Sequence, residues 1–345
     1  MGDRTRIRAA SATGDRTRLK TAPAAGRAEA CLPEDAPEDD ARRAHPHAGA
    51  PLRDAGHDHD ARHDRAGTHL RDVGPHRDGA HLGHDQVVGM LGDLRRTLRA
   101  RFGTSDERRL DSESRLGPGE RRARHVVVPV RFHIVHSGPR GRLSKATVRR
   151  QISTLNAAYG GRRGGADTRV RFRLAGYGRA DKAAWFHNPR RYEGPMKRRL
   201  RKGGRGTLNV FTAAVGTDVL GFATFPQHYK KNPRVDGVII DYRSLPGGPY
   251  KRFDRGYTAV HEIGHWLGLL HTFEGGCLPP GDGVADTPYE AEPAEGCPYS
   301  RDTCPQRGDD PVHNFMDYAH DPCMREFTAG QGRRIRAAWA AYRSR

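Results

Sequence analysis

Eleven consecutive residues constrain this chain more strongly than any other stretch: they read H-E-I-G-H-W-L-G-L-L-H, from His261 to His271. His261 and His265 are four residues apart, so on a helix their imidazoles lie on one face, with Cβ atoms about 5–6 Å apart. Gly268 can take the positive φ that ends a helix, and the chain then brings His271 back toward the same point. Three protein ligands and one open position form the catalytic type of zinc site. The spacing therefore predicts zinc bound by His261, His265 and His271.

Glu262 follows the first of these ligands directly. In that position a carboxylate can take a proton from water at the metal without binding the metal itself. The alternative interpretation is an ordinary buried helix with histidines on its polar side, because a bare H-E-x-x-H motif arises by chance fairly often. The additional glycine and third histidine disfavour that alternative. We therefore expect Glu262 to act as a general base and then as a general acid.

Motifs on both sides of this stretch resemble one known family. The stretch itself is similar to metzincin zinc endopeptidases, whose second hallmark is a methionine-containing turn beneath the metal. With its flanking motifs it looks like the pappalysin family. The motifs that carry the likeness are His261–Phe273, Cys277, Asp286-Thr287-Pro288, Asn314–Tyr318 and Cys323–Gln331, and it runs back through Gly221–Pro226 and Asp236–Val238 to about Val126.

The resemblance implies a zinc-dependent endopeptidase that hydrolyses peptide bonds in protein or peptide substrates. Met316 would pack beneath the histidines without taking part in the chemistry. Tyr318 resembles the tyrosine that some metzincins turn toward the tetrahedral oxyanion. In metzincins an edge strand above the cleft pairs with the extended substrate, and Gly221–Phe225 is the candidate by position.

Two further expectations concern acidic residues after the helix. Family members carry calcium near Asp282, Asp286 and Thr287, whose oxygens suit that ion, and acidic turn residues without a cation are the equal alternative. Some relatives prefer a basic residue just after the scissile bond. Asp321 is the only carboxylate between Tyr318 and Cys323 and is the candidate for that pocket, although it can instead cap a turn or bind a cation.

Five cysteines bear on the compartment of the protein: Cys31, Cys277, Cys297, Cys304 and Cys323. Four of them lie in the C-terminal quarter, which indicates two disulfides and an oxidising environment, with free buried thiols as the alternative. The resemblance implies the pairs Cys277–Cys304 and Cys297–Cys323. We expect a secreted protein, although the first residues lack the apolar core of a signal peptide. Cys31 is a candidate latency thiol that places a thiolate on the zinc, or else a thiol without a role.

The composition divides the chain at about residue 125. Residues 1–124 are of low complexity and bury too little apolar surface to offset their ordering entropy, so we expect a disordered N-terminal arm or pro-segment. Within it, Gln86–Phe102 has the apolar period of a short amphipathic helix. Residues 125–345 form the expected catalytic domain, with an N-terminal lobe (125–271) and a C-terminal lobe (272–345).

The expected fold of the catalytic domain is an α/β (α+β) zincin. Val126–His136 is rich in β-branched residues and predicts a central strand, on which His133 and His136 are expected to be structural histidines. Leu143–Tyr159 predicts a helix that backs a mixed twisted sheet. The active-site helix follows, then a smaller irregular lobe that carries the disulfides, and Thr328–Tyr342 predicts a terminal helix. The basic run Lys197–Arg205 is expected to be a solvated helix end and loop.

The formal charge of +19 permits binding to anionic partners, but no aromatic-interleaved basic motif or zinc-finger spacing supports specific nucleic-acid recognition. No apolar run approaches the length of a membrane span. Two rival functions remain open. One is a catalytically silent zinc-binding protein of the same fold, and the other is a basic nucleic-acid-binding protein that acts through its arm. The sequence leaves the oligomeric state undetermined.

Overall fold

The computed structural model describes residues 82–113, 125–216 and 219–344. Cys31 lies outside the described residues. The α-helices are α1 (His84–Phe102), α2 (Glu107–Glu113), α3 (Lys145–Tyr159), α4 (Ala183–His187), α5 (Glu193–Leu200), α6 (Tyr257–Trp266) and α7 (Ala329–Ala338). The strands are β1 (Val126–His136), β2 (Val170–Asp181), β3 (Leu208–Ala213), β4 (Gly221–Ala223) and β5 (Val238–Asp241). Short 3-10 helices cover Pro226–Lys230, Pro233–Val235 and Tyr242–Ser244, and the π-helical turn η4 covers Trp339–Arg343.

The five strands form one mixed sheet in the order β2-β1-β3-β5-β4. The first four strands of that order are parallel, and β4 runs antiparallel to β5, with Phe222 opposite Ile239. The expected mixed sheet is therefore confirmed. β4 belongs to the segment that the sequence placed above the cleft, and it forms one edge of the sheet.

The alternation of side chains along β1 divides the core into two layers. Val130, Phe132 and Ile134 pack in one buried cluster with residues of α3 and α6. Val135 points to the opposite face, where it packs with Phe186 of α4 and Met196 of α5. Because successive strand residues face opposite sides, one β-branched run supplies both layers.

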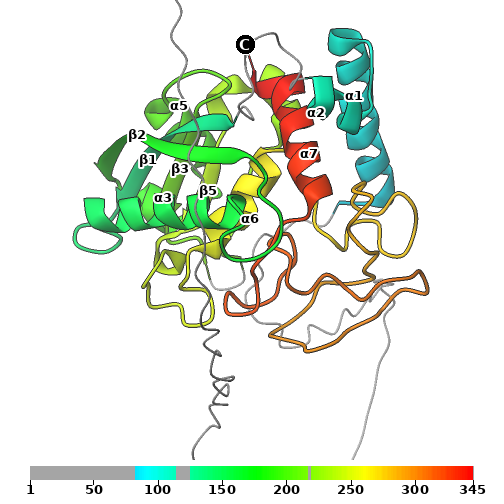
Figure 1. Cartoon of the computed structure of the whole chain (residues 1–345). Coiled ribbons are helices and arrows are strands. Elements are labelled where there is room, and N and C mark those ends of the chain that lie inside the picture. The colour runs from blue at the N-terminus through cyan, green and yellow to red at the C-terminus, as the bar shows by residue number, and fades with distance from the viewer. Residues whose placement is uncertain (1–81, 114–124, 217–218, 345) are drawn as a thin grey trace, which may run out of the picture. The chain divides into compact units, whose positions relative to one another are not determined.

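The helices α1 and α2 pack against the C-terminal helix (Figure 1). Leu94 and Leu98 of α1 are buried with Ala337 and Ala338 of α7. Two ion pairs join α2 to α7, Glu107–Arg334 at 2.6 Å and Asp111–Arg336 at 2.7 Å. The amphipathic helix expected over Gln86–Phe102 is confirmed.

The apolar stripe of α1 was expected within the low-complexity part, but α2 and the partner of that stripe were not. The small residues of α7 supply the surface that buries this stripe, and a composition average over the N-terminal part contains no information about that partner.

The residues that follow the active-site helix form an irregular region up to α7. Two disulfides join its loops, Cys277–Cys304 and Cys297–Cys323, with Cα–Cα distances of 5.4 and 5.6 Å. These are the pairs that the family resemblance implied. Of the described helices, none combines the length and apolarity that crossing a membrane requires.

Candidate metal centre

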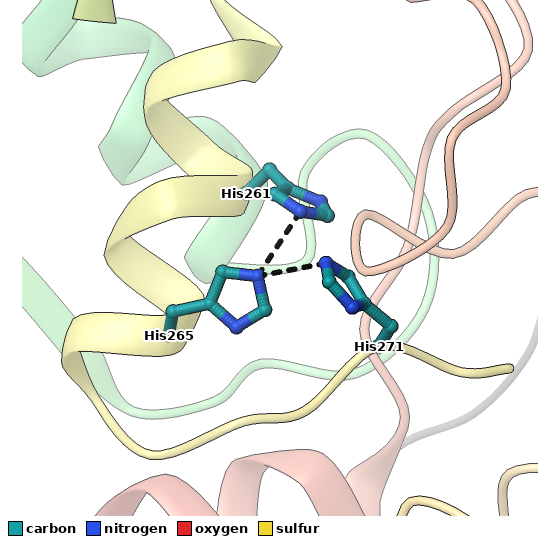
Figure 2. A group of neighbouring side chains, drawn as sticks. All are labelled: His261, His265 and His271. Carbon is teal, nitrogen blue, oxygen red and sulfur yellow. Dashed lines mark hydrogen bonds between the residues drawn. The ribbon is translucent and has the colours of Figure 1, made fainter. Parts of the chain in front are cut away.

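The three predicted zinc ligands come together at the end of α6 (Figure 2). His261 and His265 project from the helix, one turn apart. The chain reverses at Gly268, where φ is +98°. A Cβ atom at this position would lie 2.7 Å from the Cβ of Ala338, so both the backbone conformation and the packing require glycine. This reversal carries His271 back to the other two ligands.

The hydrogen bonds of the three rings fix which nitrogen faces the centre. The Nδ1 atom of His261 is 2.8 Å from the carbonyl of Phe315, and that of His265 is 2.9 Å from the carbonyl of Leu269. The Nδ1 atom of His271 is 2.6 Å from Oε1 of Glu274. Since carbonyl and carboxylate oxygens only accept, each Nδ1 must carry the proton and each Nε2 must present a lone pair.

The geometry of the three Nε2 atoms fits a zinc ion. Nε2 of His265 lies 3.2 Å from that of His261 and 3.1 Å from that of His271 (Figure 2). Three lone pairs cannot hydrogen-bond to one another, so a cation must stabilise this arrangement. Tetrahedral ligands at zinc–nitrogen distances of 2.0–2.1 Å lie about 3.3 Å apart. The residues present therefore match the donor set, tautomers and spacing of zinc.

Glu262 lies next to the ligands and is fully buried. Gly221 of β4 packs directly against its side chain. A Cβ atom at residue 221 would lie 2.7 Å from Oε1 and 2.8 Å from Cγ of Glu262. The edge strand thus leaves room for this carboxylate by presenting a glycine.

Replacing Gly221 with alanine should lower kcat by about 10²-fold while zinc content stays unchanged, because the new methyl group displaces the Glu262 carboxylate. Steady-state kinetics together with zinc analysis checks this. Gly178→Ala is the matched control, since nothing lies within 4 Å of a Cβ atom at that strand glycine. Equal kcat values for the two variants would contradict the steric role of Gly221.

The predicted methionine turn lies beneath the histidines. Met316 is fully buried, and its Sδ atom occupies the space that a Cβ atom at Gly264 would need. The turn also holds the first ligand, because Phe315 accepts the hydrogen bond from His261. Asn314 and Gln331 exchange two amide hydrogen bonds of 2.9 Å, which fasten the turn to α7.

Tyr318 lies at the same centre. Its hydroxyl is 3.4 Å from Nε2 of His271, and its ring stands edge-on to that of His271, with 5.1 Å between the centroids. Phe273 packs against both rings. The hydroxyl group therefore lies beside the nitrogen with which His271 would bind zinc.

Glu274 is a site residue that the sequence analysis missed. Its carboxylate accepts from Nδ1 of His271 at 2.6 Å and from the backbone N–H of Leu82 at 2.9 Å. A carboxylate on the distal nitrogen orients a metal-binding imidazole and increases its basicity. The available signal was the position of Glu274, three residues after the last histidine.

The start of α1 also lies beside the centre. Val87 and Leu91 are buried against Leu270, and Phe225 packs at the edge of this cluster. The ring of Phe225 is also edge-on to that of His265, at a centroid distance of 5.2 Å. The N-terminal helix therefore contacts the residues that flank two zinc ligands.

Asp321 is buried at the start of the active-site helix. Its side chain has no exposed surface, and its Oδ2 atom accepts from the backbone N–H groups of Arg255 and Tyr257, at 2.8 and 3.4 Å. A carboxylate at the start of a helix satisfies unpaired N–H groups and interacts favourably with the helix dipole. The capping role that the sequence left as an alternative is observed at the start of α6, and a role in substrate specificity stays a prediction.

The candidate calcium ligands bond to protein groups. Asp286 accepts from the hydroxyl of Thr328 at 2.8 Å and from the N–H of Gly330 at 2.7 Å, at the start of α7. Asp282 accepts from the N–H of Val284, and burial raises its pKa to about 7. Thr287 is buried nearby. Calcium at these residues stays a prediction.

Two buried acids lie behind the methionine turn. Burial, and then the neighbouring charge of Asp317, raise the pKa of Glu290 to about 9, and burial raises the pKa of Asp317 to about 7. Thr272, next to the third ligand, donates to Glu290 at 2.7 Å. Asp317 accepts from the N–H groups of Ala294 and Tyr318. These acids therefore fix the loops around the site from below.

Known proteins resemble this chain in sequence. The peptidase family described as pregnancy-associated plasma protein-A matches residues 207–340. An extracellular metalloprotease of Colletotrichum graminicola is 42% identical over 254 residues, which cover 71% of this chain and 86% of the relative. One of Verticillium alfalfae is 43% identical over 239 residues, which cover 66% and 81%.

Solved structures are similar as well. Mature mirolysin of Tannerella forsythia, in complex with a cleaved peptide, matches with a TM-score of 0.54 and 28% identity, over 61% of this chain and 90% of that chain. A promirolysin mutant matches with a TM-score of 0.57 and 27% identity, over 72% and 91%.

The mixed sheet, the three-histidine cluster and the methionine turn define a metzincin-type metallopeptidase. The family match over residues 207–340 and the similarity to the two fungal metalloproteases identify the family within this class. The chain belongs to the pappalysin family of metalloproteases.

Proposed function

We propose that this protein is a secreted zinc endopeptidase in which Glu262 transfers the proton. The observation that carries the proposal is the convergence of three Nε2 lone pairs beside a buried glutamate. The relatives named extracellular metalloproteases and the two disulfides support secretion. Its substrates would be proteins or peptides.

His261, His265 and His271 would hold the zinc, and Glu274 would keep His271 oriented. Zinc in such a site polarises the scissile carbonyl and lowers the pKa of water toward 7. Glu262 accepts the proton of the attacking water and returns it to the leaving amine. The position of Glu262 directly after His261 supports this role, because a general base must lie within hydrogen-bond reach of the water.

Tyr318 and β4 would act on the substrate. The Tyr318 hydroxyl donates to the developing oxyanion, which its position near Nε2 of His271 supports. The outer edge of β4 would pair with an extended peptide by β-augmentation. Gly221 would then have two roles, because it belongs to the strand that pairs with the peptide and it leaves room for the Glu262 carboxylate.

The N-terminal part would be a pro-segment, and residues 125–271 and 272–345 would form the two lobes of the mature domain. The bond between Leu82 and Glu274 supports a regulatory position for the N-terminal part beside the metal. The match to promirolysin covers a larger share of this chain than the match to the mature enzyme. Cys31 as a latency thiol stays a prediction.

Chelation tests the proposed function. We expect one zinc per chain, cleavage of an unfolded protein such as reduced casein, loss of that cleavage with a strong chelator, and recovery when zinc is added back. Atomic absorption and gel analysis measure these quantities. A serine-protease inhibitor is the control and should have no effect. Cleavage that persists after complete zinc removal would contradict the proposal, as would zinc-loaded protein that never cleaves after its N-terminal part is removed.

A further inference from the structure

A cavity lies at the edge of the sheet opposite β4, between β2 and the end of α5. Its volume is about 400 Å³, and its lining residues are His133, Gly178, Arg179, Ala180, Arg199, Leu200 and Lys202. It shares no residue with the zinc centre. A cavity of this size holds roughly a dozen waters and is at the small end of ligand-binding pockets.

Three cations and no acid line this cavity: Arg179, Arg199 and Lys202. The Arg179 guanidinium donates to the carbonyl of Leu143 at 3.1 Å. Within the described parts of the chain, none of the three has a carboxylate partner within salt-bridge distance. Because charged side chains that face a common concave surface repel one another, an anion between them would be stabilised.

At the inner end of the cavity lies His133, which is only 8% exposed and stacks on Phe211. Its Nε2 atom is 2.9 Å from Oδ1 of Asn209. The orientation of this amide is fixed, because Nδ2 of Asn209 donates to the carbonyls of Lys202 and Thr207, at 3.0 and 3.2 Å. Oδ1 therefore only accepts, and Nε2 of His133 must carry the proton.

The remaining ring nitrogen, Nδ1, has no hydrogen-bond partner among the described residues. Burial, and then the positive charges of Lys202 and Arg131, lower the pKa of His133 to about 4. The imidazole is therefore neutral at pH 7, and Nδ1 presents a lone pair. The cavity combines three cations with one neutral acceptor.

We propose that this cavity binds an oxyanion that still carries an O–H group, namely inorganic hydrogen phosphate. Arg199, Lys202 and Arg179 neutralise and hydrogen-bond its charged oxygens, and the phosphate hydroxyl donates to Nδ1 of His133. Sulfate has the same shape but no hydroxyl at neutral pH, so its oxygen would face the Nδ1 lone pair. A phosphomonoester is mainly a dianion without an O–H group above its second pKa of about 6. Both should therefore bind more weakly.

Calorimetric titration of the zinc-loaded full chain at pH 7.5 with inorganic phosphate, sulfate and O-phosphoserine tests the site. We expect phosphate to bind roughly tenfold more tightly than the other two, because each of them leaves a buried acceptor unpaired. Arg199→Gln and Lys202→Gln should each weaken phosphate binding roughly tenfold or more. His133→Phe keeps the stacking on Phe211 and should reduce the preference for phosphate over sulfate to about one.

Arg149→Gln is the matched control, because Arg149 is an exposed arginine on α3 that does not line the cavity, and it should bind phosphate like the unmodified protein. Phosphate bound at the zinc instead would be insensitive to Arg199→Gln and Lys202→Gln, and that result would overturn the proposal. Absence of phosphate binding, or equal affinity for sulfate in the unmodified protein, would also overturn it. The glutamine variants replace exposed residues, so the test does not depend on the folding of the His133 variant.

Discussion

Replacing Glu262 with alanine is expected to lower kcat by about 10²–10⁴-fold while the protein keeps its zinc. The three histidines bond to Phe315, Leu269 and Glu274 through Nδ1, and none of these bonds involves Glu262. The substitution therefore removes proton transfer without disturbing the ligands. Peptide hydrolysis assays and zinc analysis on the same preparation measure both quantities.

Glu262→Gln is the matched variant, because it keeps the shape of the buried side chain and removes only its basicity. The two variants should lose activity to a similar degree. Near-normal activity in either one would show that the assigned mechanism is wrong. Loss of zinc in both would instead indicate that Glu262 maintains the metal site.

Replacing Arg343 with methionine is expected to destabilise the protein by about 3–5 kcal/mol, because the substitution removes the hydrogen-bonded cation of a buried carboxylate and leaves it only Arg201, 3.7 Å away. Asp236 and Arg343 form a bidentate pair, with both N–O distances 2.9 Å and side chains 1% and 0% exposed. The guanidinium also lies 3.7 Å from the ring centroid of Trp266, which follows the second zinc ligand. Calorimetry should detect a fall in Tm of roughly 6–20 °C.

Arg333→Met is the matched control, because that arginine forms a partly exposed 3.6 Å pair with Asp286, and such pairs contribute about 0–1 kcal/mol. Combining Arg343→Met with Asp236→Asn should cost less than the sum of the two single changes, since the interaction between these two side chains can be lost only once. If the losses of stability were additive in this double-mutant cycle, Asp236 and Arg343 would not stabilise the fold through their interaction.

Features that depend on neighbouring residues could be predicted from the sequence, whereas contacts between distant residues required the structure. Local patterns were sufficient for the strand Val126–His136 and the helical stripe before Phe102, because alternation and the 3.6-residue period are properties of neighbouring residues. The same holds for the reversal at Gly268. The sequence could not choose the capping role of Asp321 over its alternatives, because the partner N–H groups belong to Arg255 and Tyr257, more than sixty residues earlier.

The sequence by itself determined which residues are the candidates for the chemistry of this protein: the types and spacing of the expected zinc ligands, the adjacent carboxylate and the family that these motifs identify. Only the tertiary structure decided what supports that chemistry, including the Glu274 carboxylate on His271, Gly221 against Glu262 and the cavity around His133. The physical reason is that the short helical spacing of a ligand motif is encoded locally. Hydrogen bonds, steric contacts and cavities between distant segments exist only after the core has packed.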